Sequence, residues 1–470
     1  MNESGDLCIS KGNCLHEWRE KQKWRIYHVE CLFVFSSSSF RMNENRWTRS
    51  DYGTYLLLTL VFLSSWTDIN GIFAELPQII LTQPEGWKLG VYLALITNFG
   101  NIAPLILVVI KCLSKKNHFS PIPINYTVIF IGMLACFFLI FFWQHTAIIR
   151  NEKYSLALLI LAFFLSLLDC TSSVSFADYI QQYQSRFTNA LFLGESLTSI
   201  IPSLLAISQG NGQLRCLPSN QTNQTIPVYQ VARFSVSIYF LCLFFLLTIS
   251  FMAFILLQWT TIARHSRQKQ SLQSRDEHVE VLNTFLNENP PPTIHLTKIS
   301  YVLLSLACTY TSSILFGMLL SISTYVLMPY GHRIFYLGTI LSPWMLTLIW
   351  IFGLIKPLIS KPFITLWIFL GSIFFVCDLF VAFKSPCPPF VNTSQGNILI
   401  LIIWLSTYVF IGYPRLVIAN YVRQYSSNGM FWYGVHVQIG ALVGSIVAFL
   451  FIESFSFFTE RMPCEELICY

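Results

Sequence analysis

The chain has 470 residues, of which 54% are hydrophobic and only 11% are charged. Soluble globular domains carry about 25% charged residues, so this composition excludes an ordinary soluble protein. The formal net charge of +6 is what basic residues near membrane segments produce, and it does not indicate nucleic-acid binding. Apolar residues gather in runs of about 20, long enough to cross roughly 30 Å of hydrocarbon, so the expected fold class is an all-α polytopic membrane protein.

Residues 1–54 come before the first apolar run and are polar and mixed in charge. For that reason they do not resemble a cleavable signal peptide. They are expected to form an N-terminal extension on the cytoplasmic side.

Hydrophobic periodicity predicts eleven transmembrane helices, six before and five after a long polar segment. These spans are expected at residues 55–77, 88–111, 123–143, 155–179, 188–209, 234–258, 299–321, 333–355, 363–383, 397–420 and 431–454. They define five regions, which are the extension 1–54, an N-terminal half 55–259, a cytoplasmic loop 260–298, a C-terminal half 299–455 and an extracellular tail 456–470.

Two independent signals orient the chain. When the N-terminus is placed inside, the inner segments, among whose charges Arg415 is counted, hold more lysine and arginine than the outer ones, as cytoplasmic loops do. The same orientation places three glycosylation sequons outside, beginning at Asn220, Asn223 and Asn392. The N-terminus is therefore predicted to be cytoplasmic and the C-terminus extracellular.

This orientation also leaves four cysteines outside, Cys216, Cys387, Cys464 and Cys469. An even number in an oxidising compartment indicates disulfides, and four cysteines allow three pairings. The pairing of Cys387 with Cys464 is favoured because it ties the loop after the ninth span to the C-terminal tail; free surface thiols are the alternative.

The first span is unusually polar and contains SSWTDINGIFAELP, with Asp68, Asn70 and Glu75. On a helix, an apolar stripe forms at i, i+3, i+4 and i+7, and we expect it to face lipid. The stripe consists of Ile69, Ile72, Phe73 and Leu76. A charge at a helix centre costs roughly 2.5–3.5 kcal/mol, so the acids on the opposite arc predict a solute pathway. For Asn70, and also for the acids, the alternative is a hydrogen bond that only joins two helices.

Three later spans repeat this pattern. Asn101 in span two comes shortly before Pro104, which frees a backbone carbonyl near mid-membrane. Span four carries Asp169 and Ser172 on one face, and span five carries Glu195. The serine has an alternative role, because it can hydrogen-bond to its own helix. Buried acids and amides in four neighbouring spans are typical of a secondary transporter.

Other functional classes lack their motifs in this sequence. There is no Walker motif for nucleotide-driven transport, no nucleophile–base pair for an enzyme, and no His/Cys spacing for a metal. No cofactor is therefore expected. A channel would repeat similar pore-lining rings, and none is visible.

Several segments in register resemble the eukaryotic riboflavin transporters of solute carrier family 52. They are SSWTDINGIFAELP, QPEGWKLGVYL, NFGNIAPL, LLDCTSSVSF, FLGESLTSIIPSLLAISQG and SPCPPF. The resemblance runs from about Tyr55 to the C-terminus. It implies an eleven-helix plasma-membrane carrier that takes up riboflavin without sodium, with a six-plus-five fold similar to major-facilitator and equilibrative nucleoside transporters. The pH dependence differs among family members.

The resemblance also assigns functional residues to this chain. The motif residues of the family correspond to the following positions of this chain: Trp66, Asn70, Glu75, Pro77, Glu85, Asn101, Asp169 and Glu195. The outer cysteines of the family correspond to Cys387 and Cys464. One departure lies in span seven, where Leu315-Phe316-Gly317 replaces a polar Thr-Asn-Gly. Affinity or selectivity for flavin analogues is therefore expected to differ in this chain.

Riboflavin has a flat three-ring system, a uracil-like edge and a polyhydroxyl ribityl chain, so its site needs an apolar slot and hydrogen-bonding groups. Trp66 and Asn70, one turn apart, are expected to supply a stacking wall and an amide. Asn101, Asp169 and Ser172 are expected on the ribityl side, with Glu75 and Glu195 as gate or proton-coupling residues. The alternatives are a carrier of nucleosides or another neutral heterocycle, and a non-transporting membrane receptor.

Overall fold

The computed structural model describes ten segments of the chain, and the account below is limited to them. They are residues 48–113, 121–180, 182–183, 187–210, 214–218, 225–229, 232–261, 297–355, 360–425 and 429–461. The chain divides into two compact units, Met1–Gly53 and Thr54–Tyr470, and the bundle described here belongs to the second.

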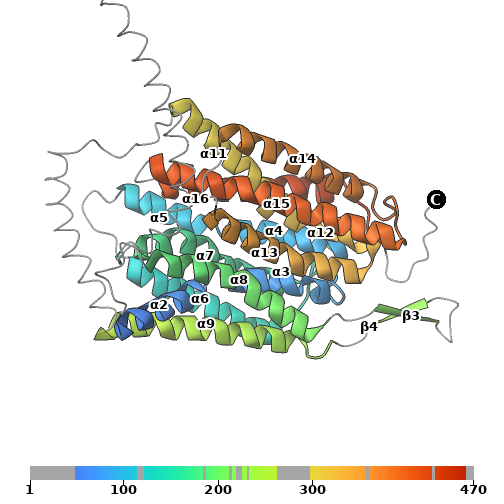
Figure 1. Ribbon diagram of the computed structural model, residues 1–470. Coiled ribbons are helices and arrows are strands. Elements are labelled where there is room, and N and C mark those ends of the chain that lie inside the picture. Colours follow the sequence, from blue (N-terminus) through green and yellow to red (C-terminus); the bar gives the residue numbers. More distant parts are fainter. Residues whose placement is uncertain are drawn as a thin grey trace, which may run out of the picture. The chain divides into compact units, whose positions relative to one another are not determined.

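Helices make up nearly all of the described structure (Figure 1). The first group consists of α2 (Arg49–Phe62), α3 (Thr67–Ile79), η1 (Gly86–Lys88), α4 (Leu89–Phe99), α5 (Ile102–Leu113), α6 (Pro121–Phe142), α7 (Leu156–Ile180), α8 (Thr188–Gln209) and α9 (Val236–Trp259). The second group consists of α11 (Lys298–Ser312), η3 (Ser313–Met318), α12 (Leu319–Leu327), η4 (Met328–Tyr330), α13 (His332–Ile355), α14 (Lys361–Phe383), α15 (Ser394–Tyr425), α16 (Gly429–Phe449) and η5 (Leu450–Ser454).

Two short antiparallel hairpins interrupt the helices. Strands β1 (Ala147–Ile149) and β2 (Glu152–Tyr154) pair with Ile148 opposite Lys153. Strands β3 (Leu214–Pro218) and β4 (Thr225–Tyr229) connect α8 to α9. We call the end of the bundle that carries η1, η5 and the hairpins the hairpin end; β3 and β4 mark it at the right of Figure 1.

Nine of the eleven predicted spans have a counterpart that can cross a membrane. Among the described residues, eight helices are long and apolar enough, and the bent pair α2–α3 makes a ninth. Helices α8 and α13, of 22 and 24 residues, lie where the fifth and eighth spans were predicted but are not among these nine. The all-α polytopic class is confirmed, whereas the number eleven is not, and the division into two halves stays a prediction.

The first span is broken in the middle, and serine side chains line the break. Helices α2 and α3 meet at an angle of 51°. The hydroxyl groups of Ser64 and Ser65 donate to the carbonyl oxygens of Val61 and Phe62, at 2.7 and 2.8 Å. The same two carbonyl oxygens also accept from the Ser64 and Ser65 amides, both at 3.1 Å, so each hydroxyl adds a second hydrogen bond. The break is buried within the protein, since Ser64 and Ser65 are at most 2% exposed.

The predicted lipid-facing stripe of the first span is wrong for three of its four residues. Ile69, Ile72 and Leu76 are at most 6% exposed, because α3 lies in the interior, in contact with α7, α8, α9 and α13. The partly exposed side of α3 instead carries Trp66, Asn70 and Phe73, at i, i+4 and i+7. Periodicity identified an apolar stripe correctly, but the stripe packs against protein rather than lipid.

The second span is also discontinuous, between α4 and α5. Gly100 and Asn101 separate the two helices, three residues before the predicted irregularity at Pro104. A Cβ atom added to Gly100 would collide with Ser166 of α7. The glycine therefore permits the break to approach α7 closely, about one turn before Asp169.

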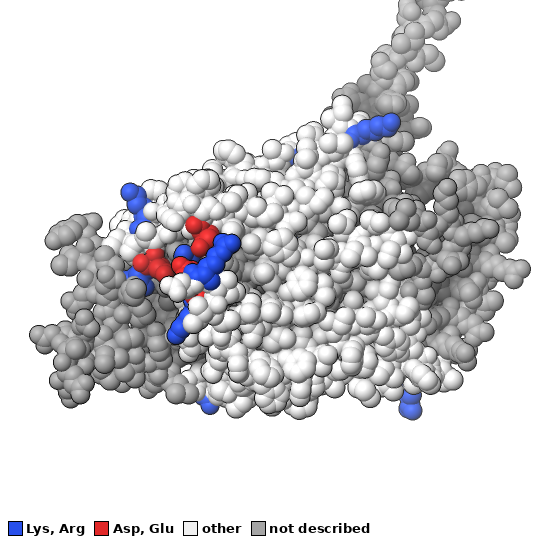
Figure 2. All heavy atoms as spheres, turned by 180° about the vertical axis from the view of Figure 1, so that it is seen from behind, with Lys and Arg blue, Asp and Glu red and all other residues white. Residues whose placement is uncertain are grey.

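The sides of the bundle are apolar, as contact with lipid requires. Exposed Phe, Leu and Ile side chains are common on α6, α9, α11 and α14. Figure 2 shows a broad middle region almost without charge, with the acidic side chains and several basic ones gathered toward the left and further basic side chains at the opposite end. This distribution fits helices that cross a bilayer and carry their charges at its surface.

Helix α16 crosses the π-helical segment η3 at very short range through its glycines, which gives a stability prediction. A Cβ atom at Gly444 would collide with the Ser313 carbonyl oxygen, whereas one at Gly434 would meet nothing within 4 Å. We expect Gly444→Ala to lower the Tm of the detergent-solubilised protein by a few degrees, as overpacking costs ~1–3 kcal/mol. Gly434→Ala is the matched control on the same helix and should leave the Tm unchanged or raise it. Equal Tm values for both variants would contradict this packing.

Candidate functional site

Besides Asp51 at the start of α2, four acidic side chains are buried within the described helices, which is costly unless each is neutralised or hydrogen-bonded. Asp68, Glu75, Asp169 and Asp378 are each at most 1% exposed. The first two lie on α3, seven residues apart and therefore about 10 Å apart along the helix axis. The polar interior predicted from the sequence is thus present, and α3 is at its centre.

Asp169 and Ser172 of α7 meet the first span at its break. The Asp68 carboxyl group is close enough to that of Asp169 to act on it electrostatically, and among the described residues Asp68 Oδ2 and both oxygens of Asp169 accept no hydrogen bond. One turn further along α7, the Ser172 hydroxyl lies 3.3 Å from the Ser65 carbonyl oxygen and 2.8 Å from that of Asp169. The sequence analysis placed Asp68 among the polar residues of the first span but did not select it for the site.

Asn70 points from α3 toward α8. Its Nδ2 donates to the hydroxyl oxygens of Thr198 and Ser199, at 3.2 and 3.3 Å. The interhelical role that the sequence left open is therefore present in the structure. Trp66, one turn earlier, is the first residue before α3 and is also partly exposed.

Asn101 lies at the α4–α5 break and is partly exposed. Its Nδ2 donates to the Asn98 carbonyl oxygen at 3.0 Å. Within the described part of the chain, no hydrogen bond joins Asn101 to the other predicted binding residues, Trp66, Asn70, Asp169 and Ser172. The structure therefore brings Asp169 and Ser172 to the first span and does not join Asn101 to them.

Glu75 is held near the hairpin end by a glutamine. Gln209 at the end of α8 donates from Nε2 to Glu75 Oε1 at 2.8 Å and to the Phe234 carbonyl oxygen at 3.2 Å. Around it, the hydroxyl groups of Tyr239 and Tyr336 donate to carbonyl oxygens of α8. Glu75 therefore sits where α3, α8, α9 and α13 converge.

Glu195 lies toward the opposite end of α8 and faces a basic residue from α15. Arg415 is close enough to act electrostatically on the Glu195 carboxyl group. The guanidinium carbon of Arg415 lies 4.3 Å from the ring centroid of Phe316, and its Nε donates to the Tyr433 hydroxyl at 3.0 Å. A ring at this distance stabilises a cation through its π face. Phe316 is one of the two residues, with Leu315, at which the chain departs from the family pattern.

Sequence reasoning missed the interior positions of Arg415 and Asp378. Arg415 was counted among the inner loop charges, although it lies within α15. Asp378 of α14 accepts a hydrogen bond of 2.6 Å from the Thr407 hydroxyl. A signal for each was available, because both interrupt long apolar runs, in GYPRLVI and in FFVCDLF.

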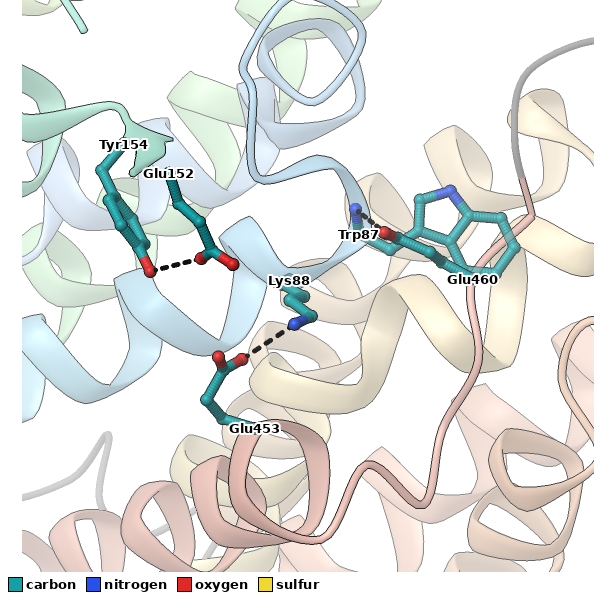
Figure 3. A network of polar contacts seen from close by, with 6 residues as sticks. All are labelled: Trp87, Lys88, Glu152, Tyr154, Glu453 and Glu460. Atoms are coloured by element: carbon teal, nitrogen blue, oxygen red, sulfur yellow. Dashed lines mark hydrogen bonds and ion pairs between the residues drawn. The ribbon is translucent and has the colours of Figure 1, made fainter. Parts of the chain in front are cut away.

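Polar contacts join the two groups of helices at the hairpin end (Figure 3). Lys88 Nζ lies 3.1 Å from Glu453 Oε2, and Glu460 Oε2 accepts from the Trp87 amide at 3.2 Å. The Trp87 carbonyl oxygen accepts from the Thr324 hydroxyl at 2.8 Å. Because Trp87 and Lys88 precede α4, these contacts tie α4 to η5, α12 and the segment after η5.

Two further residues from the family motifs have structural roles at the same end. The carbonyl oxygen of Pro77 hydrogen-bonds with His332 Nε2 at 2.7 Å. Glu85 accepts from the amide and the hydroxyl of Ser155, both at 2.5 Å, and so caps the start of α7. Beside them, the Tyr154 hydroxyl donates to Glu152 at 2.8 Å, and this bond raises the pKa of Tyr154.

Several predicted modification sites lie outside the described residues. Asn220 and Asn223 fall between β3 and β4, and Cys216 belongs to β3, of whose side chains nothing is described. Cys464 and Cys469 also lie beyond the described part. Cys387 is disulfide-bonded, and its pairing with Cys464 stays a prediction. Asn392 is exposed, as a glycosylation site must be. That it carries an oligosaccharide stays a prediction as well.

The contacts at the hairpin end predict that reversing the charge of Lys88 will open this end of the bundle. Lys88→Glu places two carboxylates together, so we expect faster maleimide labelling of a cysteine introduced at Ala206, a nearby α8 residue that is 1% exposed. The rates are compared in detergent, relative to the same protein without the added cysteine. Lys88→Glu combined with Glu453→Lys should restore slow labelling. Lys153→Glu, the same change on exposed β2, is the matched control; equal acceleration by it would contradict a specific closure.

Comparison with known proteins gives a consistent family for the whole bundle. A sequence profile described as solute carrier family 52, riboflavin transporter, matches residues 51–460. The chain is 30% identical over 432 residues to member 3-A of this family from Danio rerio, covering 86% of this chain and 96% of that protein. It is 28% identical over 437 residues to member 2 from Homo sapiens, covering 88% and 97%.

A solved structure supports the predicted architecture. The bacterial homologue of the human lysosomal transporter Spinster, in an inward-facing and occupied conformation, aligns with a TM-score of 0.52. The alignment covers 88% of this chain and 83% of that chain at 13% identity, so it shows the fold alone. Together with the matches in sequence, it completes the assignment: this chain belongs to solute carrier family 52, the riboflavin transporter family.

Proposed function

We propose that this protein carries riboflavin across the plasma membrane into the cell, without sodium. The observation that supports this proposal is the family match over residues 51–460, which includes every element that contributes to the polar interior. Relatives along nearly their whole length are riboflavin transporters by name, including member 3 from Homo sapiens at 26% identity over 469 residues. The activity proposed is transport, and no catalytic step is assigned to any residue.

The proposed contact surface for the flavin rings is the partly exposed side of α3. Trp66 and Phe73 offer aromatic faces two turns apart, with Asn70 between them. Because α8 holds the Nδ2 of Asn70, its Oδ1 is oriented as an acceptor for the imide N–H of the flavin edge. Flat aromatic ligands gain most from such apolar faces, and the few polar groups between them set orientation.

The remaining predicted residues surround this surface. Asp169 and Ser172 approach the break just before α3 and are proposed for the ribityl side, together with Asn101. Glu195 is proposed as part of a gate, because it faces Arg415 from the other group of helices. Glu75 is proposed as a second gating residue at the hairpin end, where Gln209 holds it.

Uptake of labelled riboflavin by cells that express the chain tests the proposed function. We expect saturable accumulation that excess lumiflavin inhibits, that uridine does not inhibit, and that persists when choline replaces sodium. Inhibition by uridine instead of lumiflavin would indicate a nucleoside carrier. Surface binding without accumulation would indicate a receptor. Either result would overturn the proposal.

The role of Asn70 can be separated from its role in packing. Asn70→Ala should raise the KM for riboflavin about tenfold, the equivalent of one lost hydrogen bond of ~1.4 kcal/mol. Ser199→Ala removes one α8 partner but keeps the amide, and it should leave KM close to wild type at equal surface expression. If both variants changed KM equally, the contribution of Asn70 would be helix packing alone.

A further inference from the structure

The chain crosses the hairpin end once more after its last helix. Beyond η5, the Phe457 amide donates to the Phe451 carbonyl oxygen at 3.0 Å and turns the chain out of the helical path. Residues 455–461, which we call the strap, continue from there without helix or strand. The strap follows the second group of helices but reaches the first, where Figure 3 shows Glu460 beside Trp87.

Aromatic packing and two hydrogen bonds fix the strap to the second group of helices. The Phe458 side chain is 6% exposed, and its ring centroid lies 4.9 Å from that of Phe383 in α14 and 5.5 Å from that of Tyr325 in α12. The Ser385 hydroxyl donates to the Thr459 carbonyl oxygen at 2.9 Å, and the Thr459 hydroxyl donates to the Ser385 carbonyl oxygen at 2.5 Å. Buried aromatic side chains contribute strongly to packing, so this attachment is the firm one.

Glu460 holds the first group of helices from an exposed position. Its Oε2 accepts from the Trp87 amide at 3.2 Å, although the residue itself is exposed. Gly86 permits this approach, because its φ of +56° favours glycine and a Cβ atom there would lie 3.1 Å from Glu460 Oε2. Water competes for an exposed carboxylate, so this bond forms and breaks more easily than the buried contacts of Phe458.

Trp87 is bonded both to the strap and to α12 of the second group. While its amide donates to the strap, its carbonyl oxygen accepts from the Thr324 hydroxyl at 2.8 Å, and its ring centroid lies 5.8 Å from that of Tyr325. Trp87 is 8% exposed, and α4 begins two residues later, at Leu89. These contacts therefore hold α4 to the second group, and separation of the two groups at the hairpin end requires Glu460 to release Trp87.

We propose that the strap is a latch on the hairpin end, in which Glu460 binds Trp87 when this end is closed and releases it when the end opens. The strap then stays with the second group, because Phe458 remains packed against α12 and α14. This inference rests on the proposed function, because a carrier must open each end of its bundle in turn. Movement of one group of helices against the other is the usual form of such opening.

Removal of the latch should expose the interface between the two groups of helices, whether or not riboflavin is present. A cysteine introduced at Ala206 reports on this interface, because Ala206 is 1% exposed and its carbonyl oxygen accepts from Tyr336 of the second group at 2.9 Å. In detergent-solubilised full-length protein, Glu460→Ala should increase the maleimide labelling rate of this cysteine about fivefold, as the loss of one hydrogen bond predicts. The rates are compared with those of the same protein without the added cysteine.

Glu152→Ala is the matched control for this measurement. Glu152 is also an exposed acid at the hairpin end, but it bonds to Tyr154 within the first group. Its removal should leave the labelling rate unchanged. An unchanged rate in Glu460→Ala, or an equal increase in Glu152→Ala, would overturn the inference.

A tether tests whether the latch must release during transport. Gly86→Cys and Glu460→Cys are combined, a short bifunctional methanethiosulfonate joins the two thiols in the purified protein, and mass spectrometry confirms the bridge before reconstitution into liposomes. Uptake of labelled riboflavin should fall to the level of empty liposomes and should return when dithiothreitol breaks the bridge. Each single variant, treated with the same reagent, should continue to take up riboflavin.

The outcomes separate the latch from the proposed function. Undiminished uptake by the tethered protein would overturn the latch and leave riboflavin transport intact. Absence of uptake by the wild-type protein in liposomes, in contrast, would contradict the proposed function itself.

Discussion

The structure depends on one constraint, which is that a carboxyl group inside a membrane-spanning bundle must be neutralised or hydrogen-bonded where it lies. The interior acids meet this constraint in different ways. Asp68 accepts from the Ile69 amide and lies beside Asp169, which has no hydrogen-bond donor among the described residues. Gln209 donates to Glu75, Thr407 donates to Asp378, and Arg415 faces Glu195. The group that bonds to each acid determines which two helices that acid joins. It therefore also determines which helices would shift if the acid became ionised.

The broken first span links these groups to transport. At the break, serine hydroxyls and main-chain amides both bond to the carbonyl oxygens of α2, and α3 leaves the axis of α2 and enters the interior. There it meets helices from both sides of the long 260–298 segment, α7, α8 and α9 before it and α13 after it. A helix with this many neighbours is well placed to sense a solute and to transmit its binding. The hairpin end adds direct ties between the same two groups of helices, through Lys88 and Glu453.

The sequence was sufficient to predict most of the helices and the family, but not which residues lie around each side chain. Runs of apolar residues located the helices, and the acids of SSWTDINGIFAELP correctly indicated a polar interior. The stripe containing Ile69 and Ile72 was assigned to lipid because periodicity shows that a face is apolar and not whether lipid or protein covers it. Arg415 was treated as a loop charge for a similar reason, since hydropathy does not show that Phe316 and Tyr433 lie beside it. The pairing of Asp68 with Asp169, 101 positions apart in the chain, depends on how α3 and α7 pack and has no local signature.

The central claim is that the partly exposed side of α3, which carries Trp66, Asn70 and Phe73, is where riboflavin binds. A cryo-electron microscopy map of the purified protein with riboflavin tests it most directly. The account predicts density for the three-ring system against Trp66 and Phe73, with its polar edge at Asn70 and its ribityl chain toward α7. Flavin density elsewhere in the bundle, with this side of α3 covered by other helices, would contradict it.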